Sequence, residues 1–171
     1  MPSLRISLIN EHDTNPPFES GHRDIQAMME EALLATLTKQ GVAYNVFLGD
    51  KIIAQYMLSV EYVTTDDYSW SYGNNKHSGI LLKYIVVEEG SRNQGIGKHL
   101  LKVIVNRAKK LSDEWPIRFL MVNSVQDKIE WYKEKGFHVV PGTTVDDGYT
   151  TRMVIDFLDR RGLERIAQAN R

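Results

Sequence analysis

The stretch ILLKYIVVEEGSRNQGIGKHLL, residues 80–101, decides the fold. Its first part, residues 80–87, is an apolar run rich in β-branched side chains, which predicts a buried strand. A polar loop with two close glycines, Gly95 and Gly97, follows, and a helical pattern that starts inside the loop continues to about residue 111. A strand, a glycine loop and a helix in succession direct backbone N–H groups and the positive end of the helix dipole to one place, which suits a phosphate-bearing ligand.

The glycine spacing excludes two common phosphate loops. The dinucleotide fingerprint requires three glycines as G-x-G-x-x-G, whereas only Gly95 and Gly97 are suitably spaced here. The nucleotide-triphosphate loop requires G-K followed by Ser or Thr, and this sequence lacks it. The remaining pattern is R-x-x-G-x-G, which begins at Arg92.

This pattern and the strand before it resemble the coenzyme A pyrophosphate loop of the GNAT family of N-acetyltransferases. The resemblance implies that acetyl-CoA is the co-substrate and that no metal is needed. It also implies that the backbone of the strand lines the thioester and the pantetheine, and that the loop holds the pyrophosphate. The strand residues are Ile85, Val86 and Val87, and the loop residues are Arg92, Asn93, Gln94, Gly95, Ile96, Gly97 and Lys98.

A second motif concerns the leaving group. The segment WYKEKGF, residues 131–137, resembles the family's F-Y-E-K-x-G-F ending, in which the tyrosine lies next to the coenzyme sulfur and acts as a general acid. The resemblance therefore implies this role for Tyr132. A phenol with a pKa of about 10 is protonated at neutral pH and can donate to a thiolate. The alternative is that Tyr132 only packs on an amphipathic helix.

Two positions depart from the family pattern. Many members have an Asn seven residues before the tyrosine and an Ala shortly after that Asn, where this chain has Val125, then Asp127 and Lys128. Asn123, at the end of the preceding strand, is the expected substitute as a coenzyme contact.

The fourth strand also lacks the glutamate base of the members that acetylate histone-like lysines. Deprotonation of the acceptor must then use water, a residue of the polar loop 64–78 such as His77 or Asp66, or one of Glu61 and Glu88. An amine with a pKa of about 8 needs less help than a lysine at about 10.4, so protein lysines are not the expected acceptors.

Length and composition set further bounds. The chain has 171 residues, a net charge of −1 and no cysteine, which excludes disulfides, thiolate metal sites and a cysteine nucleophile. We expect a single domain over residues 1–171, with a core at about 42–157 and a helical tail at 158–171. Without a signal peptide or an apolar run of roughly 20 residues, the expected location is the cytoplasm, away from membranes.

The order of predicted elements is β-α-β-β-β-α-β-α-β-β. It predicts an α/β (α+β) fold with a mixed, mostly antiparallel central sheet of about seven strands and helices on both faces, as in the GNAT family. Ser124 is expected to cap the third helix, Gly136 to end it, and Gly49-Asp50 and Asp147-Gly148 to form turns. The predicted strands cover residues 4–9, 44–48, 52–60, 80–87, 117–123, 137–140 and 149–157, and the helices cover about 25–40, 96–111, 126–135 and 158–171.

Three functions remain open. The main expectation is direct acetyl transfer to a primary amine of a small molecule or peptide. The alternative is toxin-like acetylation of the α-amine of aminoacyl-tRNA, because FESGHRDIQAMMEEAL, residues 18–33, resembles a toxin branch in which a cysteine stands at Ser20. The near-neutral charge does not favour tRNA. The third is a non-catalytic coenzyme A-binding regulatory domain, against which the retained Tyr132 and glycines argue. A homodimer is expected only by analogy.

Overall fold

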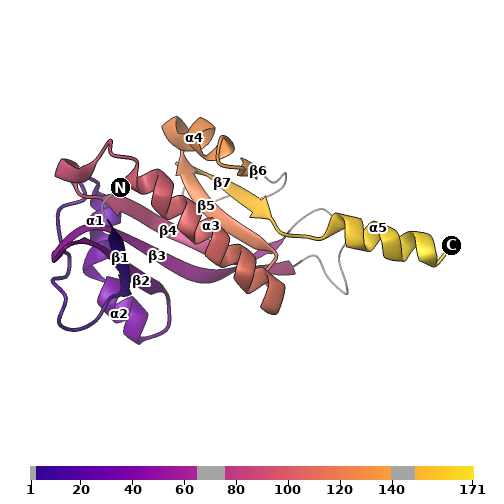
Figure 1. The fold of residues 1–171 in the computed structure, drawn as a ribbon, viewed down its shortest axis with the longest axis horizontal. Coiled ribbons are helices and arrows are strands. Elements are labelled where there is room, and N and C mark those ends of the chain that lie inside the picture. The colour runs from indigo at the N-terminus through magenta and orange to yellow at the C-terminus, as the bar shows by residue number, and fades with distance from the viewer. Residues whose placement is uncertain (1–2, 65–75, 140–148) are drawn as a thin grey trace. The chain divides into compact units, whose positions relative to one another are not determined.

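The computed structural model describes residues 3–64, 76–139 and 149–171. Within them, seven strands form a sheet in the order β1-β2-β3-β4-β5-β7-β6 (Figure 1). The pairs β1–β2, β2–β3, β5–β7 and β6–β7 are antiparallel. The strands are β1 Leu4–Leu8, β2 Val42–Leu48, β3 Lys51–Thr64, β4 Lys76–Val87, β5 Phe119–Val125, β6 His138–Val139 and β7 Thr150–Asp156. The predicted fold class is confirmed.

The helices follow the expected order along the chain. They are α1 Arg23–Glu30, α2 Ala32–Leu37, α3 Ile96–Glu114, α4 Ile129–Lys133 and α5 Arg160–Ala169, with short 3-10 turns at η2 Glu89–Ser91 and η3 Gln126–Lys128. No helix in the described ranges is both long and apolar enough to cross a membrane.

The chain divides into two compact units. The first comprises residues 1–60 and 81–106, and the second comprises residues 61–80 and 107–171. Strands β3 and β4 and helix α3 each run from one unit into the other. The division therefore does not decide between one domain and two, and the single domain stays a prediction.

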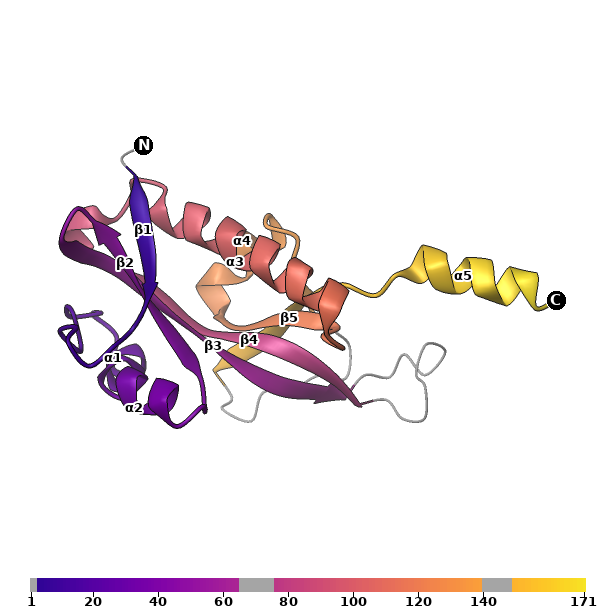
Figure 2. The ribbon, with the colours of Figure 1, turned by 60° about the horizontal axis from the view of Figure 1, so that its bottom comes forward.

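In the first unit, helices cover both faces of the strands. Helices α1 and α2 lie on one side, and the first half of α3 lies on the other (Figure 2). Met29 and Ala32 pack in one buried cluster with Tyr84 and Val86 of β4. Because side chains alternate along a strand, Ile85 and its neighbours of the same parity point to the opposite face, toward α3.

A buried chain of polar side chains crosses this sheet. The Tyr84 hydroxyl donates to Gln55 Oε1 (2.6 Å), Gln55 Nε2 donates to Asn45 Oδ1 (2.8 Å), and Asn45 Nδ2 donates to Asp13 (3.1 Å). Burial raises the pKa of the Tyr84 phenol well above its usual range, so this phenol remains a donor. Because a slip in strand register would leave these groups unpaired, the chain helps to fix the register of β2, β3 and β4.

The N-terminal helical pattern forms two helices instead of the predicted one. The first helix ends at Glu30, the chain breaks the helix at Glu31, and the second helix ends at Leu37. A single helix with one amphipathic face was expected. Leu37 is 67% exposed although its spacing predicted burial. Thr36 of α2 is buried instead, and its hydroxyl donates to the Ala32 carbonyl and accepts from the Ala43 N–H.

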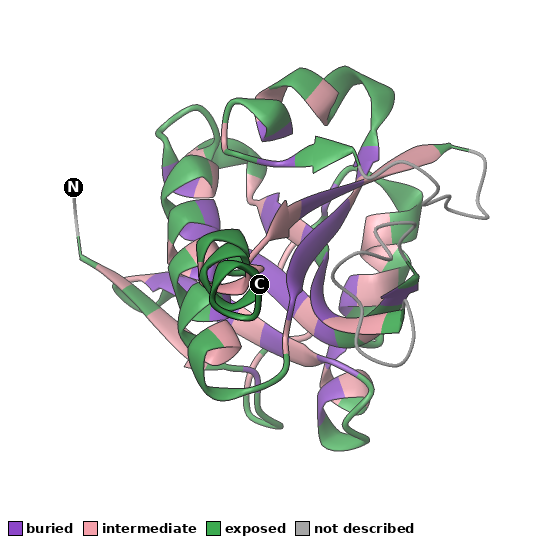
Figure 3. Cartoon of the chain, turned by 90° about the vertical axis from the view of Figure 1, so that its right-hand side faces the viewer, coloured by how far each residue is buried: buried purple, intermediate pink, exposed green. Residues whose placement is uncertain are grey.

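In the second unit, β5 is the most deeply buried strand, and α4 packs against it. Ser124 was expected to cap a helix, but it lies in β5 opposite Thr151 of β7 and its hydroxyl bonds to the Val125 carbonyl. Gly136 ends the α4 region with φ of +91°, as predicted. Helix α5 is exposed along nearly its whole length (Figure 3).

Part of the expected polar loop 64–78 is a strand. Lys76, His77 and Ser78 belong to β4, although their polar character predicted a loop. Asp66 and the Asp147-Gly148 turn lie outside the described residues.

Candidate functional site

The glycine loop joins β4 to α3 in the first unit, as predicted. Asn93 and Gly95 have positive φ angles of 61° and 76°, a conformation that asparagine tolerates and glycine adopts freely. Helix α3 begins at the next residue, Ile96, so its first free N–H groups lie at the loop. Asn93, Gln94 and Lys98 are exposed. The loop therefore has the backbone geometry that an anion-binding turn needs.

The space around Gly97 indicates whether the fold or a ligand requires a glycine at this position. A Cβ placed there would lie 3.9 Å from Val87 Cγ2, which is an ordinary van der Waals contact. The fold alone therefore does not demand glycine at this position. A glycine does allow a ligand to approach the backbone closely, which is the expected use of the second glycine in the motif.

One side of the loop is held by the β2–β3 hairpin. Glu88 donates its backbone N–H to the Ile53 carbonyl (2.8 Å), and its carboxylate forms an ion pair with Lys51 (2.7 Å). The Ser91 hydroxyl also donates a hydrogen bond to the Glu88 carboxylate (3.3 Å). The bond from Lys51 holds the pKa of Glu88 below its ordinary value. Glu88 is therefore a weak candidate for the general base, and its contacts fit a role in holding the loop.

Arg92 occupies the first position of the motif and holds the other side of the loop. Its Nε donates to the Val87 carbonyl and its Nη2 to the Ser20 carbonyl, both at 3.0 Å. We expected a charge that faces the phosphates, and the observed bonds add a second role, because they attach the loop to the N-terminal segment. No local sequence signal could reveal a contact across 72 positions, although Ser20 lies in the segment that resembles the toxin branch.

The strand residues of the predicted site lie at the end of β4, directly before the loop. Val86 is buried beneath α1 and α2, whereas Ile85 and Val87 are half-buried on the opposite face. Contact of their backbone groups with the thioester and the pantetheine stays a prediction.

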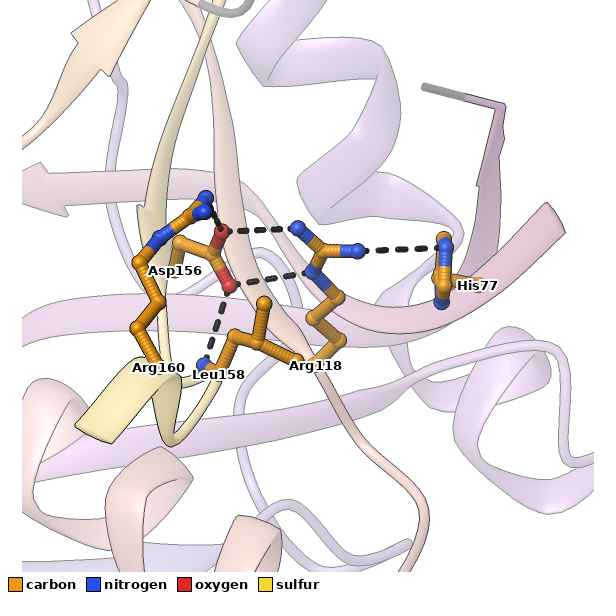
Figure 4. Close-up of polar contacts among 5 residues, drawn as sticks. All are labelled: His77, Arg118, Asp156, Leu158 and Arg160. Carbon is orange, nitrogen blue, oxygen red and sulfur yellow. Dashed lines mark hydrogen bonds and ion pairs between the residues drawn. The ribbon is translucent and has the colours of Figure 1, made fainter. Parts of the chain in front are cut away.

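His77 is part of a buried polar cluster in the second unit. Arg118 Nη1 donates to His77 Nε2 (3.2 Å), as Figure 4 shows. A guanidinium can only donate, so Nε2 is the acceptor of this hydrogen bond. The lone pair that a general base would use is therefore engaged. Glu61 is half-buried in β3.

The rest of this cluster was not predicted. Arg118 is only 8% exposed and forms a bidentate pair with Asp156 of β7. The Asp156 carboxylate also accepts from the Leu158 N–H (3.0 Å) and Arg160 (3.4 Å), next to the start of α5 (Figure 4). The cluster thus links β4, β5, β7 and the base of α5. A signal was available only in the apolar run after Arg118, which makes an arginine at the start of a buried strand unusual.

Tyr132 lies in α4 in the second unit. The residue is 8% exposed, and its ring packs edge-on against Trp131 (4.9 Å between centroids) and Phe137 (5.4 Å). Burial raises the pKa of its phenol to about 12. Among the described residues, none forms a hydrogen bond with its hydroxyl, so the proton is free to be donated. The packing alternative and the general acid are both compatible with this position, and the catalytic role stays a prediction.

Asn123 lies in β5 opposite Arg152 of β7. Arg152 Nε donates to Asn123 Oδ1 (3.0 Å), which fixes the amide and leaves its N–H₂ group as the available donor. A coenzyme contact would therefore use this amide nitrogen. Like the role of Tyr132, the contact stays a prediction.

These features define what the protein's own groups can do. The loop can bind an anion through backbone N–H groups, and the phenol in the second unit is protonated at neutral pH and can donate a hydrogen bond or a proton to a developing thiolate. In the described part of the chain, no group of three His, Cys, Asp or Glu side chains is placed to hold a metal ion. Such an inventory suits transfer of an acyl group from a phosphate-bearing thioester.

Comparison with known proteins agrees with this chemistry. The family model of the acetyltransferase (GNAT) domain matches residues 41–139, which include the loop and Tyr132. Among curated proteins, none matches the sequence.

Solved structures share the fold over nearly their whole lengths. A bacterial toxin has a TM-score of 0.76 at 14% identity, with 98% of this chain and 97% of that chain covered. AtaT complexed with acetyl-methionyl-tRNAfMet also has a TM-score of 0.76 at 14% identity, with 96% and 99% covered. A tyrosine-to-phenylalanine mutant of the AtaT toxin, bound to the C-terminus of the antitoxin AtaR and acetyl-CoA, has a TM-score of 0.70 at 14% identity, with 96% and 97% covered. At these identities the likeness is one of fold.

Proposed function

Because this chain belongs to the GNAT family of acetyltransferases, we propose that it acetylates the α-amine of an aminoacyl-tRNA. The chain is an N-acetyltransferase, and acetyl-CoA is its co-substrate. The acceptor is the part of the function that the proposal adds. Our main expectation from the sequence was a small-molecule or peptide amine. The proposed acceptor, the α-amine of an aminoacyl-tRNA, is the alternative that we had placed second.

One observation carries the choice of acceptor. The fold matches AtaT, solved with acetyl-methionyl-tRNAfMet, over 96% of this chain and 99% of that chain. The match therefore extends on both sides beyond residues 41–139 of the family domain. The FESG turn at residues 18–21, which resembles the toxin branch, lies in this additional region.

The state of the candidate bases supports the same acceptor. Glu88 is paired with Lys51, and the lone pair of His77 Nε2 accepts from Arg118. An acceptor that loses its proton with little assistance is therefore favoured. An α-amine with a pKa of about 8 meets this requirement at neutral pH, whereas a lysine side chain at about 10.4 does not.

The charge distribution supports RNA binding better than the net charge of −1 suggested. Lys98 and Lys102 are exposed one helical turn apart on α3, in the first unit. Arg161 and Arg165 are exposed one turn apart on α5, in the second unit. Exposed cations in such pairs are the usual contacts to phosphates, so local basic surfaces are present although acidic residues elsewhere balance them.

The proposed reaction is a direct transfer. The amine nitrogen attacks the thioester carbonyl carbon, an N–C bond forms and the C–S bond breaks. The thiolate takes the proton of the Tyr132 hydroxyl, the proton of the amine passes to water, and the phenolate regains a proton from solvent. Burial raises the pKa of Tyr132 to about 12, which keeps the phenol protonated at neutral pH but makes it a weaker acid than a phenol in water, and reprotonation of the phenolate by solvent completes the transfer.

The test is acetyl transfer from acetyl-CoA to separate acceptors, followed by mass spectrometry. The acceptors are charged tRNA, deacylated tRNA, a panel of small primary amines, and peptides with free N-termini. We expect N-acetyl-aminoacyl product from charged tRNA and none from deacylated tRNA. Reaction with small amines or peptides alone would overturn the choice of acceptor but not the enzyme class. Binding of coenzyme A without any reaction would favour the regulatory-domain alternative.

A further inference from the structure

Gln26, on α1, is connected to the glycine loop by consecutive hydrogen bonds. The Ser20 N–H donates to Gln26 Oε1 (2.8 Å), and the Ser20 carbonyl accepts from Arg92 Nη2 (3.0 Å). Arg92 Nε in turn donates to the Val87 carbonyl (3.0 Å), at the last residue of β4. All of these residues belong to the first unit, so the connection lies inside one compact body.

The turn between Gln26 and Arg92 is itself well fixed. Ser20 is fully buried, its hydroxyl donates to the His22 carbonyl (2.8 Å), and the same oxygen accepts from the His22 N–H (3.1 Å). Gly21 takes a φ of +80°, which allows the chain to reverse there. The Ser20 carbonyl is therefore held at a defined point, and Arg92 receives a fixed acceptor.

This arrangement orients the guanidinium before any ligand arrives. An arginine has five N–H donors, and the bonds to Val87 and Ser20 use two of them. The remaining donors and the positive charge stay at the loop. An unrestrained arginine would lose rotamer freedom when it met a phosphate, and a side chain fixed in advance avoids that loss.

We propose that Gln26 and the Ser20 turn are positioning elements for the coenzyme pyrophosphate, and that they act through Arg92. Gln26 sets the Ser20 backbone, the Ser20 carbonyl orients the guanidinium, and the guanidinium keeps its charge at the loop. The inference rests on the proposed role of the loop in coenzyme binding, and it does not depend on the acceptor. It gives the segment before the family domain, residues 18–30, a part in binding the acyl donor.

The experiment measures ligand affinity in the full chain. Calorimetry gives the Kd for coenzyme A, and an NMR titration gives the Kd for pantetheine, which carries the thiol arm without the pyrophosphate. The variants are Gln26→Ala, which removes the acceptor, and Gln26→Glu, which keeps it. Gln40→Ala, at an exposed glutamine just after α2, is the matched control. Arg92→Gln, alone and combined with Gln26→Ala, tests whether Gln26 acts through the arginine.

We expect Gln26→Ala to raise the Kd for coenzyme A about fivefold to tenfold, the effect of one hydrogen bond. Its Kd for pantetheine stays unchanged, and Gln26→Glu and Gln40→Ala stay within about twofold of the wild type. In the Arg92→Gln background, Gln26→Ala has no further effect beyond about twofold, because the two residues act in series.

Three outcomes would overturn the inference. They are an unchanged affinity of Gln26→Ala for coenzyme A, an equal loss for coenzyme A and pantetheine, and effects of Gln26→Ala and Arg92→Gln that simply add. Absence of coenzyme A binding by the wild type would be a different failure, because it would remove the coenzyme site itself.

Discussion

Arg118 and Asp156 form a bidentate ion pair, with 3.1 Å between Nε and Oδ1 and 3.0 Å between Nη2 and Oδ2. Both side chains are almost fully withdrawn from solvent, with 8% and 13% exposed. Phe119, next to Arg118, is paired with Asp156 in the β5–β7 register, so the ion pair closes the end of this strand pair. Arg118 lies 41 positions from His77 and 38 positions from Asp156 in the sequence, and only folding brings these residues together.

Loss of one partner of this pair should destabilise the protein strongly. Asp156→Ala leaves a buried guanidinium without its carboxylate, which typically costs about 3 kcal/mol or more. We expect the free energy of unfolding in urea to fall by that amount. Asp113→Ala, which removes an exposed i,i+4 pair with Lys109, is the control and should change stability by less than about 0.5 kcal/mol. Equal losses of unfolding free energy in the two variants would show that the buried pair contributes no more to stability than the exposed pair.

Tyr132→Phe should reduce acetyl transfer without loss of the fold. The hydroxyl makes no hydrogen bond with the described residues, and the ring contacts with Trp131 and Phe137 persist in phenylalanine. Loss of a positioned general acid typically lowers the rate by at least about a hundredfold. We expect kcat to fall by that order while the Kd for coenzyme A stays unchanged. A variant with wild-type kcat would mean that Tyr132 is a packing residue.

The same phenol predicts a pH dependence of stability. Burial raises the pKa of Tyr132 from 10.0 to about 12, so the unfolded chain loses this proton first as the pH rises. The stabilising contribution is complete below pH 10 and disappears as the pH passes through about 12. Tyr132→Phe lacks this contribution, whereas Tyr84, whose phenol is also buried, contributes equally to both proteins.

The comparison isolates Tyr132. The unfolding free energy of the wild type, minus that of Tyr132→Phe, should decrease by on the order of 2 kcal/mol between about pH 9 and 12. Chemical denaturation at several pH values measures it. A difference that does not change with pH would contradict the burial of the hydroxyl.

The arginines of α5 provide a test of RNA binding. Arg161→Ala combined with Arg165→Ala removes two exposed cations from one face of the helix. If both contact phosphates, the affinity for charged tRNA should fall and the slope of log K against log salt should become shallower by about two. Gln168→Ala, on the same exposed helix, is the uncharged control. An unchanged salt slope in the double variant would place the RNA contacts elsewhere.

Much of the architecture could be predicted because its signals are local. The apolar runs of β2 and β3, the turn at Gly49-Asp50 and the loop between β4 and α3 each depend on a few adjacent residues. Ser124 shows where local reasoning fails. Its sequence position suits a helix cap, but pairing with Thr151 of β7 keeps it in a strand. The strand at residues 76–78 was missed for the same reason, because a contact distant in sequence accompanies it, in which the Arg118 N–H donates to the Ser78 carbonyl. The break at Glu31 was also missed.

The candidate site divides in the same way. Loop residues and Tyr132 could be named from short motifs, and the structure places them in the expected elements. The hydrogen bond between Arg92 and the Ser20 carbonyl could not be predicted, because a backbone acceptor leaves no trace in residue identity. The engagement of His77 by Arg118 likewise depends on the three-dimensional arrangement and not on the composition of the loop.

Competition for the acetyl group in a single reaction tests the choice of aminoacyl-tRNA as acceptor. Wild-type protein, isotope-labelled acetyl-CoA, charged tRNA, a mixture of small primary amines, and peptides with free N-termini are combined near pH 7.5, a point close to the α-amine pKa of about 8. Nuclease digestion and mass spectrometry then locate the label. We expect the label on the α-amine of the aminoacyl-adenosine fragment, and we expect it to disappear when the tRNA is deacylated. Label that accumulates on the small amines or peptides, with the aminoacyl fragment unmodified, would contradict this choice of acceptor.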